Sequence, residues 1–295
     1  MSTYQQPVKQ PLDDILFLIV LFNQSPAQSE TYQSLASALN NSDADYQIIL
    51  FDNTPKKSTY IPSDSRVIFY SEGINEGLPT AYNFAAQKAL VADKKYLILL
   101  DQDSSINLAY LHAVSEGIGS MSDNDAVLVP DIISAQKAVS PYTINDWGII
   151  QLPPNSAKSP LSAINSFSVI SLNALTQIGG FDTFYWLDAL DFHFFHQVHK
   201  QGLNVKRLNV TVEHNLSLSH GAVPRWRLNN IARYEMAFYA ECLSPPAILL
   251  GLLRVLARGI KRRQDLHNTA GLFAYAREAF IGLFLGVKRR YNSGF

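Results

Sequence analysis

Residues 95–103 read KYLILLDQD, an apolar run that ends in two aspartates separated by a single glutamine. Its length and uninterrupted apolar character are typical of a strand that is buried on both faces of a sheet. Similar runs precede it at 15–22 (ILFLIVLF), 46–51 (YQIILF) and 66–70 (RVIFY), and segments with helical spacing of apolar residues lie at 28–39 and 78–92. Strands that alternate with helices predict an α/β fold, a mostly parallel sheet flanked by helices.

The second half of the chain continues this pattern less regularly. Further strands are expected at 126–129, 166–172 and 205–212, with a short helix that ends at Gly179-Gly180 and a longer one at 192–201 that ends before Gly202. Residues 134–159 are rich in Ser, Pro and Asn and are expected to form a long irregular loop. The chain therefore divides into a flexible N-terminus at 1–14, an α/β domain at 15–225 and a C-terminal amphipathic helical region at 226–295.

Composition excludes several classes of protein. A chain of 295 residues with 47 % hydrophobic and 17 % charged residues can bury a sizeable core and is not disordered. A formal net charge of −1 argues against a nucleic-acid partner. The single cysteine, Cys242, excludes an intrachain disulfide and favours a reducing compartment. Residues 1–14 lack the apolar run of a signal peptide, and no segment reaches the roughly 20 apolar residues of a spanning helix, so we expect a cytoplasmic protein.

The C-terminal region differs in charge from the rest of the chain. From Ser244 to Phe295 there are nine Lys or Arg and two Asp or Glu, a formal charge of +7, against −8 for the remainder. Residues 246–263 place large apolar side chains on one helix face and basic ones on the other, and 271–290 have a similar character. Cationic amphipathic helices of this kind favour attachment to a membrane surface. Packing on the α/β domain or on a dimer partner is the alternative.

Polar side chains follow the expected strands at the point where each one ends. They are Asn23, Asp52-Asn53 and Asp101-Gln102-Asp103. Ligands of such sheets bind at the carboxyl ends of the strands. Asp101 and Asp103 can bind a divalent metal, Mg²⁺ or Mn²⁺, that bridges them to a diphosphate. A solvated turn is the alternative for this pair.

Two other polar segments also have alternative interpretations. Asp52 and Asn53 are favoured turn residues, but the Asp52 carboxylate could instead accept the imide N–H of uracil or thymine. Gly77 precedes an expected helix that carries Asn83, and a glycine there lets the backbone approach a phosphate or a ribose closely. Spacing alone does not decide between these interpretations.

Asp188 and Asp191 lie one helical turn apart among large apolar residues. An inverting sugar transfer needs a carboxylate to take the proton of the acceptor hydroxyl, and apolar surroundings raise the pKa of such a base. The alternative is a helix cap at Asp188 and a partner of the helix dipole at Asp191.

Histidines are a further feature of this part of the chain. His193, His196 and His199 are spaced three apart, whereas zinc motifs usually place two histidines four apart, so no zinc site is predicted on them. His214 follows an expected strand, and a core or surface role is the default expectation for a single histidine.

Taken in order, these segments resemble the family-2 glycosyltransferases with a GT-A fold, a Rossmann-like nucleotide-sugar-binding fold, and within them the rhamnosyltransferase-like branch. The matching segments are IVLFN (19–23), FDNT (51–54), 75–83, LLDQDS (99–104), GGFD (179–182) and LDALD (187–191), followed by His214. The resemblance extends over 15–220, about 70 % of the chain. It departs from the family at His193, where an acidic residue is common, and at His196, where arginine is common.

The resemblance implies a role for each site residue. Asp191 is implied to be the catalytic base, Asp103 and His214 to hold the metal, Asp101 to contact the ribose or a metal-bound water, and Asp52 to recognise the base. The residues implied to line the nucleotide pocket are Phe22, Asn23, Asn53, Gly77, Asn83 and Gln102. The donor implied is dTDP-L-rhamnose and the acceptor a growing, lipid-linked surface polysaccharide at the inner face of the cell membrane. The alternatives are a UDP-hexose donor and a catalytically silent GT-A scaffold.

Overall fold

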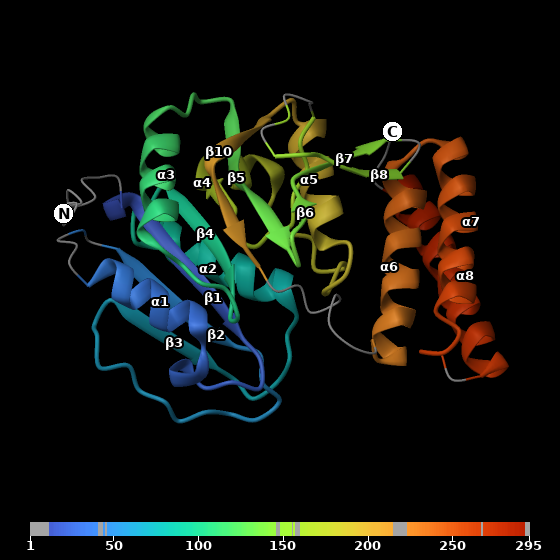
Figure 1. Ribbon diagram of the computed structural model, residues 1–295, viewed down its shortest axis with the longest axis horizontal. Helices are drawn as coiled ribbons and strands as arrows, with labels where there is room; N and C mark the ends of the chain where they lie inside the picture. Colours follow the sequence, from blue (N-terminus) through green and yellow to red (C-terminus); the bar gives the residue numbers. More distant parts are fainter. Residues whose placement is uncertain are drawn as a thin grey trace.

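The computed structural model describes residues 12–40, 44, 46–145, 148–154, 156, 160–214, 223–266 and 268–292. Figure 1 shows a twisted sheet with helices on its faces and, beside it, a group of three long C-terminal helices. The strands are β1 (Ile15–Leu21), β2 (Gln47–Asp52), β3 (Val67–Ser71), β4 (Tyr96–Asp101), β5 (Asp125–Ser134), β6 (Lys137–Ser140), β7 (Tyr142–Asn145), β8 (Gly148–Gln151), β9 (Val169–Ser171) and β10 (Asn204–Glu213). The α-helices are α1 (Glu30–Leu39), α2 (Leu78–Val91), α3 (Leu108–Gly119), α4 (Leu172–Ile178), α5 (Leu190–Lys200), α6 (Arg225–Cys242), α7 (Pro245–Lys261) and α8 (Thr269–Asn292).

The expected mostly parallel sheet is confirmed. Among the described residues, eight strands form one sheet in the order β10-β5-β9-β4-β1-β2-β3, with β6 paired to β5. Neighbouring strands are parallel except β9, which is antiparallel to β4 and β5, and β6, which is antiparallel to β5. Each of the strands expected from the sequence forms within the sheet, and 126–129 is the middle of the longer β5.

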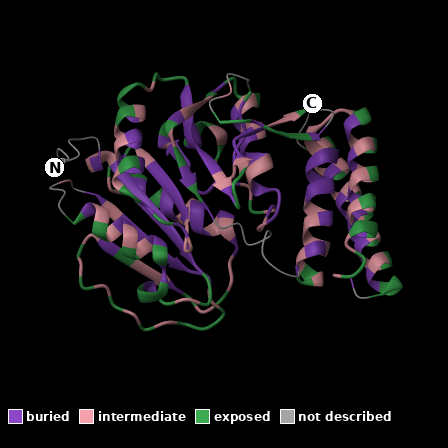
Figure 2. Cartoon of the chain, viewed as in Figure 1, coloured by how far each residue is buried: buried purple, intermediate pink, exposed green. Residues whose placement is uncertain are grey.

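Helices cover both faces of the sheet, as the continuous apolar strands predict. Alternate residues of β1 belong to two separate cores: Leu16 and Leu18 pack with α2, α4 and α5, whereas Phe17 and Ile19 pack with α1 and α3. Figure 2 shows the resulting buried strands between half-buried helices. Burial on both faces leaves the ends of the strands as the accessible part of the sheet.

Two expectations need correction. Residues 134–159 were expected to be an irregular loop, but they contain β6 and the antiparallel pair β7–β8. Helix α3 was not anticipated, since its apolar side chains are mixed with small residues. The expected flexible N-terminus lies mostly outside the described residues, apart from a turn of 3-10 helix, Leu12–Asp14.

The helices α6, α7 and α8 pack through small side chains. Helix α7 turns Ala247, Gly251, Val255 and Gly259 inward, and a Cβ on Gly251 would lie 2.3 Å from the ring of Tyr239. Large apolar side chains of α7 and α8 consequently point outward. Those that are more than half exposed are Leu249, Leu253, Ile260, Phe273, Phe280 and Phe284.

Helix α8 is long and apolar enough to cross a membrane by length and composition, the one such helix in the described part of the chain. The sequence had been expected to contain no such segment. In the structure, α8 packs along α6, with Gly282 against the backbone of Arg233. Its buried Glu278 pairs with Arg233 and Arg277. The helix therefore packs as part of the three-helix group.

Candidate active site

The carboxyl ends of β1, β2 and β4 lie side by side. The register pairs Val20 of β1 with Asp101 of β4, and Leu21 of β1 with Asp52 of β2. The two carboxylates expected from separate motifs therefore lie at the same edge of the sheet, on either side of β1. This edge is where ligands of parallel sheets bind.

Gln102 and Asn23 hold the backbone at this edge. The Gln102 side chain accepts the Phe22 N–H at 2.7 Å and donates to the Phe22 carbonyl at 3.2 Å. Asn23 adopts a left-handed conformation (φ 54°), and its N–H donates to the Thr54 hydroxyl at 2.8 Å. Gln102 thus positions Phe22, which is 43 % exposed beside the strand ends.

Asp52 fits both of its alternative interpretations. Its Oδ1 accepts the Thr54 N–H and its Oδ2 accepts the Ser71 hydroxyl, each at 3.0 Å, so it stabilises the turn after β2. It also lines a cavity of about 540 Å³ together with Asn23 and Phe69. Each carboxylate oxygen can accept a second hydrogen bond, so the turn contacts leave capacity for a ligand donor.

Asn53 and Gly77 connect β2 to the start of α2. The Asn53 amide donates to the Gly77 carbonyl at 3.2 Å and accepts the Glu76 N–H at 3.1 Å. Gly77 caps α2 with φ 83°, and a Cβ there would lie 2.4 Å from the Trp186 ring. A glycine is therefore required by this conformation and by the contact with Trp186.

Asn83 is placed apart from the strand-end residues. Its side chain donates to the Phe181 carbonyl and accepts the Phe181 N–H, both at 2.8 Å. It lines a separate cavity with Gly179 and Gly180. The contacts of Asn83 hold the segment 179–182 against α2, and they do not bring its amide to the cavity that contains Asp101.

Asp101, Asp103 and His214 form the expected cluster. One ligand atom from each lies within 4.8 Å of the others. The Ser104 hydroxyl lies 2.9 Å from His214 Nδ1, which leaves Nε2 facing Asp101 Oδ2 at 3.3 Å. His214 is buried, whereas Asp101 is accessible.

The donor set of this cluster fits a divalent cation. Burial and the neighbouring Asp101 charge raise the pKa of Asp103. Burial lowers the pKa of His214, but the hydrogen bond and charge of Asp101 and the charge of Asp103 raise it overall. Two adjacent carboxylates repel each other, and a cation held between them relieves that repulsion. Two oxygens and one imidazole nitrogen are ligands that Mn²⁺ accepts.

Asp188 and Asp191 belong to a cavity of about 360 Å³ that Asp101 and His214 also line. Burial raises the pKa of both Asp188 and Asp191 to about 6. The Tyr142 hydroxyl donates to Asp191 Oδ2 at 3.0 Å. Asp188 is not the cap of α5, since Ala189 occupies that position. The structure thus unites residues that are almost 90 positions apart, Asp101 and Asp188, around one cavity.

Two residues of this cavity region were not identified from the sequence. Arg227 pairs with Asp188 at 3.0 Å, and Asp188 Oδ2 has no hydrogen-bond partner among the described residues. Tyr142 comes from the segment that was expected to be an irregular loop. Neither residue lies in a recognisable motif. The position of Arg227 and Tyr142 beside apolar segments was only a weak indication of a role in a site.

Comparisons with known proteins identify the family and the fold. Residues 17–179 match the family described as glycosyl transferase family 2. No curated protein matches the chain in sequence. A structure of GalNAc-T7 with UDP, GalNAc and Mn²⁺ is similar over 77 % of this chain and 50 % of that chain (16 % identity, TM-score 0.52). This chain thus spans about half the length of GalNAc-T7.

A second solved structure shares the fold over most of its length. The mannosyltransferase PcManGT from Pyrobaculum calidifontis, in complex with GDP-Man and Mn²⁺, is similar over 99 % of this chain and 92 % of its own (11 % identity, TM-score 0.52). Residues 1–349 of S. aureus TarS match over 95 % and 92 % (12 % identity, TM-score 0.49). The family match covers more than half of the chain, and the fold agrees with it. The chain belongs to glycosyl transferase family 2 and has a GT-A-like fold.

Proposed function

We propose that the protein is an inverting transferase that moves a sugar from a nucleotide diphosphate sugar to an acceptor hydroxyl. The observation that carries this proposal is the single cavity lined by Asp101, His214, Asp188 and Asp191. In a single displacement, the acceptor attacks the sugar from the side opposite the departing diphosphate. A base and a diphosphate site must therefore both border the sugar, and this cavity offers both.

Asp191 takes the proton of the acceptor hydroxyl in this proposal. Its Oδ1 accepts the Phe192 N–H and its Oδ2 accepts the Tyr142 hydroxyl, both at 3.0 Å, so the carboxylate has a fixed orientation. With a pKa of about 6 it is ionised at neutral pH and is a stronger base than an ordinary aspartate. The proton moves to Asp191 as the new bond to the sugar forms.

The strand-end cluster serves the leaving group. Asp103 and His214 would hold a divalent cation, which when bound neutralises charge on the departing nucleotide diphosphate. The Ser104 hydroxyl fixes the orientation of the His214 ring through its contact with Nδ1. The other ring nitrogen, Nε2, therefore faces Asp101 Oδ2. Asp101 contacts the ribose, and Asp188 Oδ2, which has no hydrogen-bond partner in the described part of the chain, accepts a hydroxyl of the sugar.

The proposed donor is dTDP-L-rhamnose, because LDQDS at 100–104 resembles the rhamnosyltransferase form of the metal motif. The base would occupy the cavity of about 540 Å³ beside Asp52 and Asn23. A UDP-hexose is the second candidate donor, since uracil and thymine present the same imide N–H to Asp52. The intact Asp101, Asp103 and Asp191 favour an enzyme over a silent scaffold.

A donor screen tests this proposal. Purified protein is heated with dTDP-L-rhamnose, UDP-glucose, UDP-GalNAc or GDP-mannose, with and without Mn²⁺, and release of nucleotide is then measured with glycan acceptors. We expect dTDP-L-rhamnose to raise the melting temperature only with Mn²⁺, and to give nucleotide release. If only UDP-sugars raised the melting temperature, the donor would be a UDP-sugar and not dTDP-L-rhamnose. Absence of stabilisation and of release with every donor would contradict the transferase and support the scaffold.

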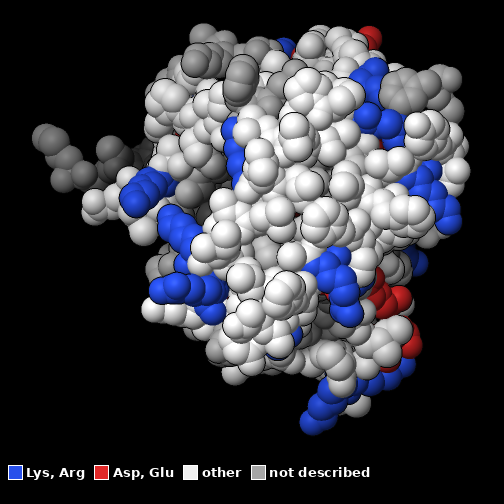
Figure 3. All heavy atoms as spheres, turned by 90° about the vertical axis from the view of Figure 1, so that its right-hand side faces the viewer, with Lys and Arg blue, Asp and Glu red and all other residues white. Residues whose placement is uncertain are grey.

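We also propose that α7 and α8 attach the protein to the cytoplasmic face of the cell membrane, where a lipid-linked acceptor lies. We define the α7–α8 face as Leu249, Leu253, Ile260, Phe273, Phe280 and Phe284, which are all more than half exposed. Figure 3 looks onto this end of the molecule and shows a broad uncharged surface with several Lys and Arg at and within its edges, and a few Asp or Glu beside them on one side. Exposed apolar groups beside positive charge fit an anionic lipid surface.

A further inference from the structure

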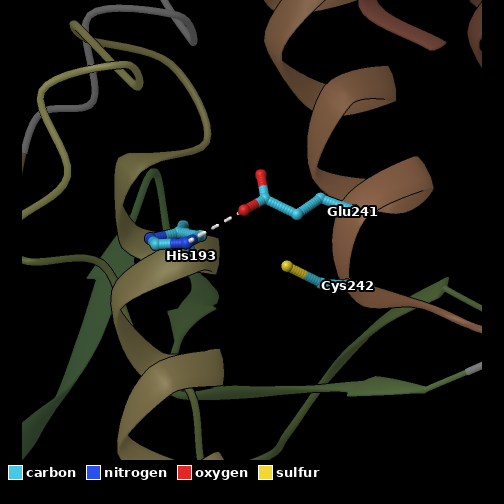
Figure 4. A group of neighbouring side chains, drawn as sticks. All are labelled: His193, Glu241 and Cys242. Carbon is cyan, nitrogen blue, oxygen red and sulfur yellow. Dashed lines mark ion pairs between the residues drawn. The ribbon is translucent and has the colours of Figure 1, made fainter. Parts of the chain in front are cut away.

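The three histidines of α5 do not converge, but one of them meets side chains from another helix. His199 Nε2 contacts the Leu161 carbonyl at 2.9 Å, away from the other two. His193 faces Glu241 and Cys242, the last two residues of α6 (Figure 4). One ligand atom from each of these three residues lies within 4.8 Å of the others.

We propose that His193, Glu241 and Cys242 bind a zinc ion that ties α5 to the end of α6. His193 Nε2 and Glu241 Oε1 are 3.8 Å apart, close to the separation of roughly 3.3–3.8 Å between two ligands of a tetrahedral zinc. Imidazole nitrogen, carboxylate oxygen and thiolate sulfur are each ligands that zinc accepts. Asp182 Oδ2, also 3.8 Å from His193 Nε2, or a water completes the coordination.

The surroundings orient Glu241 and His193 for this role. Glu241 Oε2 accepts the Tyr185 hydroxyl and Arg289 Nε, both at 2.7 Å, and Oε1 accepts Arg289 Nη2 at 3.3 Å, so the carboxylate is fixed with Oε1 toward His193. The Tyr185 ring stacks on His193 with centroids 4.7 Å apart. Hydrogen bonds to a ligand carboxylate and packing of a ligand imidazole are what orient metal ligands in proteins.

His193 has the protonation state that metal binding needs. The Gln197 amide nitrogen lies 3.1 Å from Nε2, and since that group is a donor, Nε2 carries a lone pair. A metal takes the place of the Gln197 donor at this nitrogen, and the Cys242 thiol loses its proton as it binds.

The charges of the cavity select a zinc-like ion. The adjoining cavity, about 660 Å³, is also lined by Lys200, Arg289 and Arg290, so a hard cation held only by charge is disfavoured there. Zinc is bound more strongly than Mg²⁺ or Mn²⁺ by thiolate and imidazole ligands. The strand-end cluster at Asp103 has no thiolate, and its two carboxylates suit Mg²⁺ or Mn²⁺. The two sites therefore differ in the metal that each prefers.

Cobalt spectroscopy tests the site independently of sugar transfer. Because Cys242 is the only cysteine, a thiolate-to-Co²⁺ charge-transfer band reports on this residue alone. We expect the metal-free protein of residues 1–295 to develop that band with one equivalent of Co²⁺, to lose it when Zn²⁺ is added, and to melt several degrees higher with Zn²⁺.

Variants separate the proposed ligands from their neighbours. Cys242→Ser and His193→Gln should each lose the band and the zinc-dependent rise in melting temperature. His196→Ala is the matched control, because His196 lines the same cavity on the same helix but lies outside the cluster. Asp103→Asn should also keep the band. Absence of the band in the wild-type protein, its persistence in His193→Gln, or its loss in His196→Ala or Asp103→Asn would overturn the proposal.

Discussion

Asp191 is subject to opposing effects on its ionisation. Its hydrogen bonds from Tyr142 and from the Phe192 N–H lower the pKa, but burial raises it more, to about 6. A general base works in its ionised form, so activity is lost as the pH falls through this value. We expect kcat/KM to be level above pH 7 and to fall tenfold per pH unit below about pH 6.

Asp188 provides the control for this pH profile, because its pKa is also raised to about 6. If Asp191 is the base, Asp188→Asn should keep the fall in kcat/KM below about pH 6 (the acidic limb of the profile), with a lower overall rate. Loss of the limb in Asp188→Asn, measured from pH 5 to 8 with constant ionic strength, would assign the limb to Asp188 instead.

Replacement of Asp191 by Asn should separate chemistry from binding. We expect a drop in the transfer rate of roughly 10²–10⁴-fold, the usual contribution of a general base, with the affinity for the nucleotide sugar unchanged. Because the raised pKa means that the ionised carboxylate destabilises the folded state above pH 6, Asp191→Asn should melt at a higher temperature than wild type at pH 8. Single-turnover assays and thermal melts measure the two effects. Full activity in this variant would exclude Asp191 as the base.

Asp103 should govern the metal dependence of donor binding. In Asp103→Asn we expect the Mn²⁺-dependent thermal shift by the donor to disappear, because one carboxylate of the cluster is lost. Asp93→Asn is the matched control, since Asp93 is exposed, lies outside the cluster and has a left-handed backbone that Asn also tolerates. An unchanged Mn²⁺ effect in Asp103→Asn would place the metal elsewhere.

Site residues could be predicted where they follow a strand, and not where they depend on distant contacts. Asp52 and Asp101 were identified because a buried strand precedes each of them, and the register brings both to one edge. The Asp188–Arg227 ion pair, in contrast, joins residues 39 positions apart that share no motif. Gly77 and Asn83 were singled out for contact with the nucleotide, which stays a prediction, and in the structure they contact Trp186 and Phe181.

At the scale of elements, burial on both faces made the strands easy to recognise. β1, β2 and β4 are almost wholly buried, and such strands are apolar throughout. The pair β7–β8 was missed because its strands have four residues each, with three exposed in β8, and so lack an apolar run. The amphipathic character of α7 could be recognised in the sequence. The sequence did not indicate that the face with large apolar side chains points outward, because the face with Gly and Ala packs against the neighbouring helices.

The packing of α8 on α6 depends on Gly282. A Cβ at this position would lie 2.0 Å from the Arg233 carbonyl oxygen, a backbone atom that cannot move without shifting α6. We expect Gly282→Ala to destabilise the protein by about 1–3 kcal/mol, the usual cost of overpacking. Gly119→Ala, at the end of α3, is the control, since no atom lies within 4 Å of the added methyl group. Chemical denaturation compares the two, and equal stabilities would contradict this packing.

At the scale of the whole molecule, charge and apolar exposure coincide at one end. The segment from Ser244 to Phe295 carries a formal charge of +7, and its two acidic residues, Asp265 and Glu278, pair with arginines. Six large apolar side chains of α7 and α8 are more than half exposed, whereas most of the residues that these two helices bury are Gly or Ala. Exposed apolar side chains gathered at one end of a molecule favour an apolar phase that covers them, either a membrane or another protein surface. The positive charge favours an anionic lipid surface as that phase.

Vesicle binding tests the α7–α8 face directly. We expect the protein to sediment with phosphatidylcholine vesicles that contain phosphatidylglycerol, less with pure phosphatidylcholine, and less at high salt. A variant with Leu253→Ser, Phe273→Ser and Phe284→Ser should bind at least tenfold more weakly, because it loses three exposed apolar groups. Its activity on a soluble acceptor should be unchanged, since none of these residues lines the cavity of Asp191.

The α/β domain supplies a control of the same chemistry. Ile61 and Val91 are 85 % and 82 % exposed there, so Ile61→Ser and Val91→Ser remove apolar surface outside the α7–α8 face. These changes should leave vesicle binding intact, because that binding is attributed to α7 and α8 alone.

Sedimentation velocity tests the alternative, in which a second copy of the chain covers the α7–α8 face instead of lipid. The membrane proposal would be wrong if the wild-type protein were a dimer that does not bind anionic vesicles and the triple variant were a monomer. The α7–α8 face would then be a protein interface.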